Sequence, residues 1–245
     1  MTVKIHRIKR TFGLLSNTPF HPQWLMSCGK TTDLKEKKEL LKGVVLDLGC
    51  GNRLPERFIT GSARYIGLDY YYTATELYHS RPDIYANAEC LPFADNTIDT
   101  VLLLDVLEHL PGPENCLREI YRVLATGGSL IIHVPFIYPI HDAPLDYHRW
   151  TQYGLRNLIE KSGLTVRSET ALGKPIVTAG LMMNLSMCKT LINSMEKLNP
   201  GILLVFFLPL LIPLINLACY LLAYITPADK FMPFKYHVIA FKDTV

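Results

Sequence analysis

The chain has 245 residues, 49% of them hydrophobic and 19% charged, so a single α/β domain with a full core accounts for most of its length. Its formal net charge of +3 is too small to indicate a nucleic-acid-binding protein. The six cysteines are scattered without a Cys-x-x-Cys pair, which predicts neither a metal site nor a disulfide framework. No apolar core of a secretory leader precedes Asn17, and we expect a cytoplasmic protein.

Residues 1–40 are mixed in composition, and we interpret them as an N-terminal cap with one short helix over Thr32–Leu41. A domain that binds a small ligand is predicted to follow, over residues 41–173 and 231–245. An apolar helical insert over residues 174–230 separates its two parts.

The most informative stretch is residues 44–52, Val-Val-Leu-Asp-Leu-Gly-Cys-Gly-Asn. A short apolar run that enters a Gly-x-Gly turn is typical of a buried parallel strand followed by a ligand-binding loop. Gly49 and Gly51 have no Cβ, so a ligand can approach their backbone closely. Asp47 lies just before the turn, where it can orient the loop. A dinucleotide site requires a third glycine at position 54, and Leu54 therefore favours a ligand without a pyrophosphate.

A second short apolar run, Tyr65–Asp69, also ends in a carboxylate. Asp69 follows the glycine turn by about 20 residues, the spacing at which an acidic residue at the end of the second strand reaches ribose hydroxyls. The two signals, in this order and at this distance, favour a cofactor that contains a nucleoside.

The remaining periodicity alternates strands with helices and predicts a doubly wound, mostly parallel sheet. Further strands are expected at Ile84–Asn87, Thr100–Leu104, Ser129–Val134, Leu164–Thr170 and Tyr236–Phe241. One helix is expected over Pro113–Leu124, closed by Gly127-Gly128, and another is expected from a Thr151 cap to Gly163. Ligands of such sheets bind at the carboxyl ends of the strands.

These motifs, with Ala88-Glu89-Cys90-Leu91-Pro92-Phe93 and Val106-Leu107-Glu108-His109-Leu110, resemble the type 11 domain of class I S-adenosylmethionine-dependent methyltransferases. The resemblance is ordered and covers roughly residues 41–170. It implies a Rossmann-like sheet of seven strands, with the last strand antiparallel beside the fifth, and S-adenosyl-L-methionine as cofactor. The cofactor-binding residues that it implies are Asp47, Gly49, Cys50, Gly51, Asp69, Tyr70, Asn87, Ala88, Glu89 and Asp105.

One position departs from the family pattern. The family usually has aspartate before the Ala-Glu pair, where its carboxylate accepts a hydrogen bond from the adenine amino group, and this chain has Asn87. An amide oxygen still accepts such a bond, without charge assistance. The departure supports a second hypothesis, a catalytically silent, membrane-associated scaffold that retains the fold. A third, a nicotinamide-dependent oxidoreductase, is disfavoured by Leu54.

The resemblance implies methyl transfer, and we predict a small-molecule or lipid-linked acceptor, with O- or C-methylation. Histidine suits a general base because its ordinary pKa is near neutrality, and we predict His141 or His109 in that role. Two blander interpretations stay open: Asp146 and Arg149 form an ion pair that only holds a loop, and His109 is a capping or packing residue. An acceptor that is already nucleophilic needs no base, since positioning alone supplies much of the rate.

Residues 198–228 include no charged side chain, and Ile202–Tyr224 is long enough to cross a bilayer. If the last strand completes the sheet, the insert must cross an even number of times, dip in and return, or lie flat. Pro209 and Pro213 are expected to break it midway. We therefore expect association with a membrane surface through residues 202–224, with a buried helical pair in a soluble protein as the alternative. Such an insert would suit a quinone, a lipid or a lipid-linked saccharide as acceptor.

Overall fold

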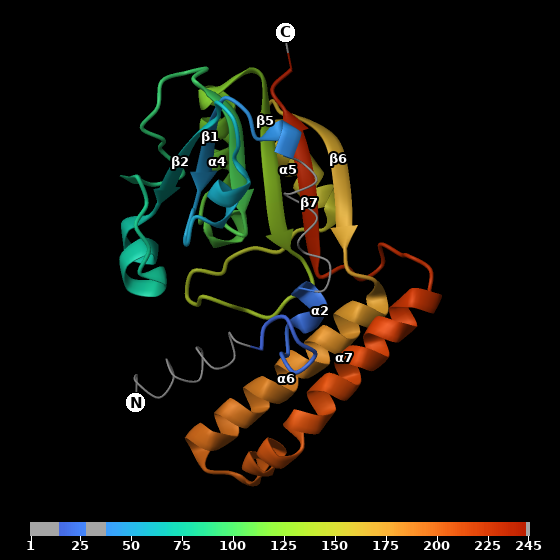
Figure 1. The fold of residues 1–245 in the computed structure, drawn as a ribbon. Coiled ribbons are helices and arrows are strands. Elements are labelled where there is room, and N and C mark those ends of the chain that lie inside the picture. The colour runs from blue at the N-terminus through green and yellow to red at the C-terminus, as the bar shows by residue number, and fades with distance from the viewer. Residues whose placement is uncertain (1–14, 28–37, 244–245) are drawn as a thin grey trace. The chain divides into compact units, whose positions relative to one another are not determined.

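The computed structural model describes residues 15–27 and 38–243, which form two compact units (Figure 1). We call residues 32–136, 140–172 and 235–245 the sheet unit, and residues 1–31, 137–139 and 173–234 the helical unit. Of the predicted N-terminal cap, the described residues 15–27 belong to the helical unit, together with the insert. The predicted helix over Thr32–Leu41 lies mostly outside the described residues. Within the part that is described, Lys38–Leu40 form a short 3₁₀ helix.

The sheet unit is built on a seven-stranded sheet with the order β3-β2-β1-β4-β5-β7-β6. Strands β1 to β5 are parallel, and β7 is antiparallel between β5 and β6. This arrangement confirms the predicted fold class. The strands are β1 Val44–Leu48, β2 Arg64–Asp69, β3 Ile84–Tyr85, β4 Ile98–Leu104, β5 Leu124–Pro135, β6 Thr165–Leu172 and β7 Lys235–Phe241.

Two helices on the sheet bury the apolar stripes that the sequence predicts. Helix α4, Pro113–Val123, turns Leu117 and Ile120 into a core where both side chains are fully buried. Helix α5, Gln152–Lys161, begins as predicted, because the Thr151 hydroxyl accepts a hydrogen bond from the Gly154 backbone N–H at 3.2 Å. Shorter helical turns occupy Leu54–Phe58, Thr73–Tyr78 and Leu107–His109.

Two local predictions were wrong. Gly127 and Gly128 do not close helix α4, which ends at Val123 and passes at Leu124 directly into extended backbone. Gly127 instead takes a left-handed conformation, with φ of 78°, inside the longer strand β5. The third strand stops at Tyr85, two residues earlier than predicted, because it pairs only with the end of β2.

The helical unit is dominated by α6, Pro175–Lys197, and α7, Leu208–Ile225, which lie side by side (Figure 1). A 3₁₀ helix, Pro200–Phe206, connects them. The apolar run 202–224 therefore does not form one continuous helix, and the predicted interruption is present. The break comes at Phe207, just before Pro209, whereas Pro213 lies inside α7 and does not end it.

A buried polar pair joins the two helices. The Asn184 amide donates to Asn216 Oδ1 at 2.8 Å, and both side chains are fully buried. Asn216 also donates to the backbone carbonyls of Pro19 and His21, at 2.6 and 3.0 Å. The segment that leads into helix α2, Trp24–Ser27, is thereby fastened to α7 by bonds made in an apolar setting.

Candidate active site

The glycine turn after β1 has the geometry that its sequence predicts. Gly49 has φ of 70°, and a Cβ there would lie 2.4 Å from the side chain of Val106. Gly51 has φ of 46°, and no atom lies within 4 Å of the place where its Cβ would be. Gly49 is therefore required for packing inside the loop, whereas Gly51 leaves open space beside the backbone.

Asp69, at the end of β2, is the polar centre of this loop. Its carboxylate accepts hydrogen bonds from the Gly51 backbone N–H at 3.0 Å, the Tyr70 backbone N–H at 2.8 Å and the Thr73 hydroxyl at 2.7 Å. The side chain is buried. Because a carboxylate offers about four acceptor positions, these bonds fix Asp69 and leave capacity for a ligand hydroxyl.

Asp47 lies beside it on β1 and is also buried. It accepts one hydrogen bond, from the Tyr65 hydroxyl at 2.6 Å. Burial raises the pKa of Asp47 to about 7, and the charge of Asp69 acts in the same direction. Asp47 thus orients the strand end through Tyr65, and burial makes its charged form unfavourable.

Other predicted cofactor contacts divide into backbone and side-chain roles. Cys50 is buried and packs against Gly67, so a small side chain is required there, and burial raises the pKa of its thiol to about 12. Tyr70 has an exposed ring, and its backbone N–H is used by Asp69. Ala88 is buried at the edge of the core.

The Asn87-Ala88-Glu89 segment uses its polar side chains within the protein. The Asn87 amide oxygen accepts from the Glu89 backbone N–H at 2.9 Å, and its second lone pair stays compatible with the predicted contact to an adenine amino group. The Glu89 carboxylate accepts from the Gly112 backbone N–H at 3.0 Å, at the start of helix α4. Its contacts indicate a structural role for Glu89.

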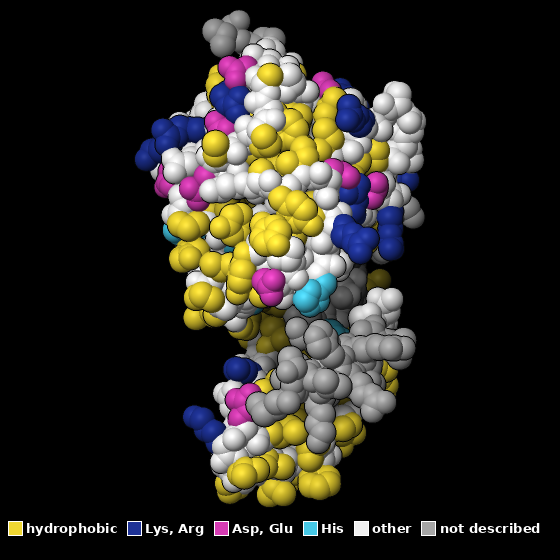
Figure 2. Space-filling model, turned by 90° about the vertical axis from the view of Figure 1, so that its left-hand side faces the viewer, with side chains coloured by type: hydrophobic (Ala, Val, Ile, Leu, Met, Phe, Trp, Pro, Cys, Tyr) yellow, Lys and Arg dark blue, Asp and Glu magenta, His cyan; other side chains and the backbone are white. Residues whose placement is uncertain are grey.

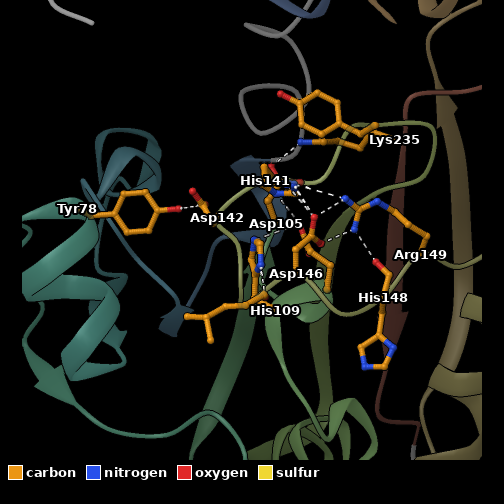
Figure 3. Close-up of polar contacts among 12 residues, drawn as sticks. Tyr78, Asp105, His109, His141, Asp142, Asp146, His148, Arg149 and Lys235 are labelled. Atoms are coloured by element: carbon orange, nitrogen blue, oxygen red, sulfur yellow. Dashed lines mark hydrogen bonds and ion pairs between the residues drawn. The ribbon is translucent and has the colours of Figure 1, made fainter. Parts of the chain in front are cut away.

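Asp105 follows β4 with a left-handed backbone, φ of 59°, which is uncommon for a residue other than glycine. Its carboxylate forms an ion pair with the buried Lys235 of β7 at 2.5 Å (Figure 3). This pair connects the carboxyl end of β4 with the start of the antiparallel strand β7.

Close to Asp105 in the sequence, Glu108 and His109 meet the side chain of His141, which comes from the loop after β5. Glu108 is fully buried, and its Oε1 lies 3.8 Å from His109 Nε2 and 3.7 Å from His141 Nε2. The two imidazole rings meet edge to face at 4.8 Å between centroids. The structure therefore brings together the two histidines predicted as candidate bases, from loops after β4 and β5. We call these three residues the Glu108 cluster.

Each histidine of the cluster is held through its other ring nitrogen. His109 Nδ1 bonds the Leu145 carbonyl at 2.7 Å, and His141 Nδ1 lies 3.2 Å from Asp146 Oδ2. Asp146 is held in turn by Arg149, which donates from both guanidinium nitrogens, as Figure 3 shows. The predicted Asp146–Arg149 ion pair is thus confirmed, and besides holding the loop it orients His141.

The electrostatics of the cluster follow from burial. Burial raises the pKa of Glu108, while the pKa of His141 is raised by the Glu108 carboxylate beside it. Arg149 holds the pKa of Asp146 at about 2, against the effect of its burial. The cluster can therefore share a proton between Glu108 and the imidazoles, or offer one carboxylate and two nitrogens to a cation.

Sequence reasoning placed Glu108 near the expected site without giving it a role, and did not include Tyr78 or Lys235. Tyr78, on the turn after β2, donates to Asp142 of the loop after β5 at 2.5 Å, so the two sides of the site touch (Figure 3). A signal existed for Glu108, which precedes His109 in the Leu-Glu-His motif, and for Lys235, a charge at the start of an apolar strand. No local pattern predicts Tyr78.

A separate surface hollow lies around the first residues of β1, β2 and β4, among them Val44, Arg64 and Ile98. It opens at the amino ends of the strands. Because sheets of this topology bind ligands at the carboxyl ends, we do not assign the cofactor to it.

Comparison with known proteins agrees with this geometry. Residues 46–132 match the family model of the methyltransferase domain. The chain carries a class I S-adenosylmethionine-dependent methyltransferase domain. The glycine turn, the Asp69 carboxylate and the Asn87 oxygen fit S-adenosyl-L-methionine, the expected cofactor of this domain.

Individual relatives give the same family at low coverage. The ubiquinone/menaquinone biosynthesis C-methyltransferase UbiE of Klebsiella pneumoniae is 37% identical over 89 residues, which cover 34% of this chain and 35% of that protein. The chain thus spans about a third of the length of the curated relatives it matches.

Solved structures share the fold of the methyltransferase domain. A presumed methyltransferase from Bacillus halodurans has a TM-score of 0.53 at 15% identity, over 87% of this chain and 100% of that one. The [4+2]-cyclase SpnF has a TM-score of 0.56 at 18% identity, over 91% and 83% of the two chains. At these identities the likeness concerns the fold alone.

Proposed function

We propose that this protein transfers a methyl group from S-adenosyl-L-methionine to a small-molecule acceptor. The observation that carries the proposal is the bonded pair of Gly51 and Asp69 at the carboxyl ends of β1 and β2, inside the matched domain. The relatives that are C-methyltransferases of ubiquinone and menaquinone biosynthesis favour methylation of an aromatic carbon in a quinone-like acceptor.

When bound, S-adenosylmethionine supplies an electrophilic methyl group on a sulfonium. Asp69 would accept a hydrogen bond from a ribose hydroxyl. Three protein donors fix its carboxylate and leave acceptor capacity for the ligand. The open space beside Gly51 admits the ligand to the backbone, and Asn87 is placed to accept from the adenine amino group.

We propose that the Glu108 cluster, which follows β4 and β5 at the same edge of the sheet, faces the acceptor. Removing a proton from a hydroxyl of the acceptor leaves negative charge, which must be stabilised before carbon or oxygen attacks the methyl group. The cluster provides for this in either of two forms: His141 Nε2 as the base, with His109 as the second candidate, or a cation held by the three side chains. Asp146 and Arg149 keep His141 in place in both forms.

Calorimetry of S-adenosylmethionine binding to detergent-purified full chain tests the proposal. We expect one site of micromolar affinity in the native protein. Asp69→Ala removes the acceptor of three protein donors and the predicted ribose contact, so binding should weaken more than about 100-fold. The matched control is Asp95→Ala, a change at an exposed aspartate that pairs with Arg122, and should bind as the native protein does.

Folded native protein that binds no S-adenosylmethionine would overturn the assignment and favour the scaffold hypothesis. Binding followed by transfer of a labelled methyl group to a reduced quinone would support the finer proposal. Transfer only to acceptors without an aromatic ring would contradict it. At present no observation of the structure favours the scaffold.

We propose, second, that the helical unit binds a lipid surface. Helices α6 and α7 are long and apolar enough to cross a membrane, with 22% of each apolar window buried. Length and composition alone are weak evidence, since core helices of soluble proteins can share both. The exposed residues of α7 and of the connection before it add to the case, because they are almost all apolar. The large ones are Leu203, Val205, Phe206, Phe207, Leu210, Leu214, Leu217, Tyr220, Leu221, Leu222, Tyr224 and Ile225.

The exposed side of α6 differs, since it includes Ser186, Lys189, Glu196 and Lys197. Figure 2 shows hydrophobic side chains crowded at the lower end of the helical unit, with charged ones above them. The asymmetry favours a hairpin that lies in the interface, with α7 and the connection in the apolar layer and α6 nearer the headgroups.

The covalent junctions support the same reading. The chain leaves the sheet at Leu172 and returns at Lys235, and these two residues are paired between β6 and β7. A single crossing would place the two junctions on opposite sides of a bilayer, so the insert must return to the side from which it enters.

Flotation with phosphatidylcholine–phosphatidylglycerol vesicles tests this second proposal. A Leu210→Lys/Leu217→Lys chain should lose most vesicle binding, because each leucine contributes about 1.5–3 kcal/mol when buried in lipid. The matched control, Ser186→Lys, adds the same kind of charge to α6 and should bind normally. Equal binding by both variants would contradict the proposed face, and native protein that stays with the soluble fraction would contradict membrane association.

A further inference from the structure

We infer that the Glu108 cluster is a binding site for a divalent transition-metal ion, held by Glu108, His109 and His141. The inference deepens the proposed function, on which it rests for placing the cluster beside the acceptor. Its first support is convergence. One oxygen of Glu108 and one nitrogen of each histidine lie within 4.8 Å of one another, from two separate loops.

The carboxylate of Glu108 is the second, independent support. Its side chain is fully buried, and neither oxygen has a hydrogen-bond partner among the described residues. A buried carboxylate without a donor is costly, since water no longer solvates the charge. The two Nε2 atoms that face Oε1 lie at 3.7 and 3.8 Å, beyond hydrogen-bond distance. A cation between the three atoms would neutralise the carboxylate.

The orientation of both rings is the third support. The Leu145 carbonyl that faces His109 Nδ1 can only accept, so Nδ1 carries the proton and Nε2 has a lone pair. His141 Nδ1 lies 3.2 Å from Asp146 Oδ2, which can accept its proton, and 3.4 Å from Arg149 Nη2, which can only donate to it; the shorter contact favours the same tautomer as in His109. Metal-binding histidines are oriented like this, with the second nitrogen donating to a carbonyl or carboxylate. His109 Nε2 therefore offers a lone pair beside the Glu108 carboxylate, and His141 Nε2 offers a second one when Nδ1 donates to Asp146.

The dimensions also fit. Metal–ligand bonds of about 2.0–2.2 Å to nitrogen and oxygen place tetrahedral ligand atoms about 3.4 Å apart. The two separations from Glu108, 3.7 and 3.8 Å, are close to this value, and all three ligand atoms lie within 4.8 Å of one another, so side-chain rotations must bring them together around an ion. Two imidazoles and one carboxylate suit zinc, cobalt, iron or nickel better than magnesium or calcium. Three protein ligands leave an open position, where an oxygen of the acceptor would bind.

Cobalt(II) is the probe for the test, because its visible absorption reports nitrogen ligation and coordination number. Full chain treated with a chelator, then titrated with Co²⁺, should bind one ion with new visible bands. Glu108→Gln and His141→Gln should each weaken this binding more than about 100-fold, and Asp146→Asn, which alters only the support of His141, about 10–100-fold. His79→Gln changes an exposed histidine outside the cluster, and should leave the bands unchanged.

Circular dichroism of the same samples reports whether each variant folds, and calorimetry reports whether it binds S-adenosylmethionine. Together they separate the metal site from the proposed methyl transfer. Protein that binds S-adenosylmethionine and no Co²⁺ would overturn the metal site and leave the proposed function standing. Protein that binds Co²⁺ and no S-adenosylmethionine would do the reverse. Co²⁺ bands that survive in both Glu108→Gln and His141→Gln would place the ion elsewhere and also overturn the inference. If one variant does not fold, the other decides the result.

Discussion

Two buried carboxylates at the same edge of the sheet differ in what surrounds them. Asp69, after β2, accepts hydrogen bonds from Gly51, Tyr70 and Thr73. Glu108, after β4, is at least as buried, and among the described residues its carboxylate has no hydrogen-bond partner, with imidazole nitrogens at 3.7 and 3.8 Å. The cofactor side of the site is therefore complete in the protein alone. The buried Glu108 carboxylate is stabilised by a positive partner, either a proton on the cluster or the metal ion that we infer.

Asp47, with one hydrogen-bond donor, lies between Asp69 with three and Glu108 with none among the described residues. Its substitution has the largest expected effect. Its folded pKa of about 7 lies above its ordinary value, so between about pH 4 and 7 the folded protein keeps a proton that the unfolded chain has released. Its contribution to stability is therefore lost as the pH rises through that window. Asp47→Asn should raise the free energy of unfolding by up to about 4 kcal/mol at pH 8, with little change at pH 4.

Urea unfolding at both pH values measures this effect. Asp95→Asn, at an exposed position, is the control and should keep the native pH dependence. An Asp47→Asn protein whose stability falls between pH 4 and 8 as steeply as the native protein's would show that the Asp47 carboxylate is not the cause.

The two glycines of the turn sharpen the comparison next. Gly49→Ala combines left-handed strain with a Cβ only 2.4 Å from Val106, and should lower the free energy of unfolding by about 3 kcal/mol. Gly51→Ala has the strain without the collision and should cost about 1–2 kcal/mol. The added methyl group would enter the open space where we expect the cofactor. The loss in cofactor-binding free energy should therefore be at least as large as the loss in unfolding free energy. Equal stabilities for the two variants would contradict the packing role of Gly49.

On the other side of the site, Glu108→Gln should lower the pKa of His141 in metal-free protein. The Glu108 carboxylate is the main cause of the raised pKa, and a neutral amide removes its charge while keeping its shape. Histidine Cε1–H chemical shifts followed against pH measure the change, with His79 as the internal control. A His141 titration that stays the same in both proteins would mean that Asp146, not Glu108, sets its charge.

The smallest effect is expected at the start of α5, directly after the loop that holds His141. Thr151→Ala removes the hydroxyl that accepts from the Gly154 N–H and should cost about 1 kcal/mol in unfolding free energy. Thr151→Ser keeps the acceptor and should be near native. A loss of equal size in both variants would indicate that the methyl group, and not the cap, matters.

Much of the fold was predictable because its signals are local. The apolar runs before Asp47 and Asp69 fixed two strands, and the stripe with Leu117 and Ile120 fixed helix α4. The errors came where local preference was overridden. Gly127 was interpreted as a helix stop, yet pairing of β5 with β4 begins already at Leu124 and draws the glycines into the strand.

The sequence by itself determined the domain family, the cofactor class and the presence of an apolar insert, because glycine turns, strand-end acids and long uncharged runs act over short stretches of chain. Only the tertiary structure decided which side chains share a site. His109 and His141 are 32 positions apart and meet at Glu108 because parallel strands β4 and β5 end at the same edge. Whether a buried carboxylate has a donor depends on such long-range packing, which no spacing in the sequence records.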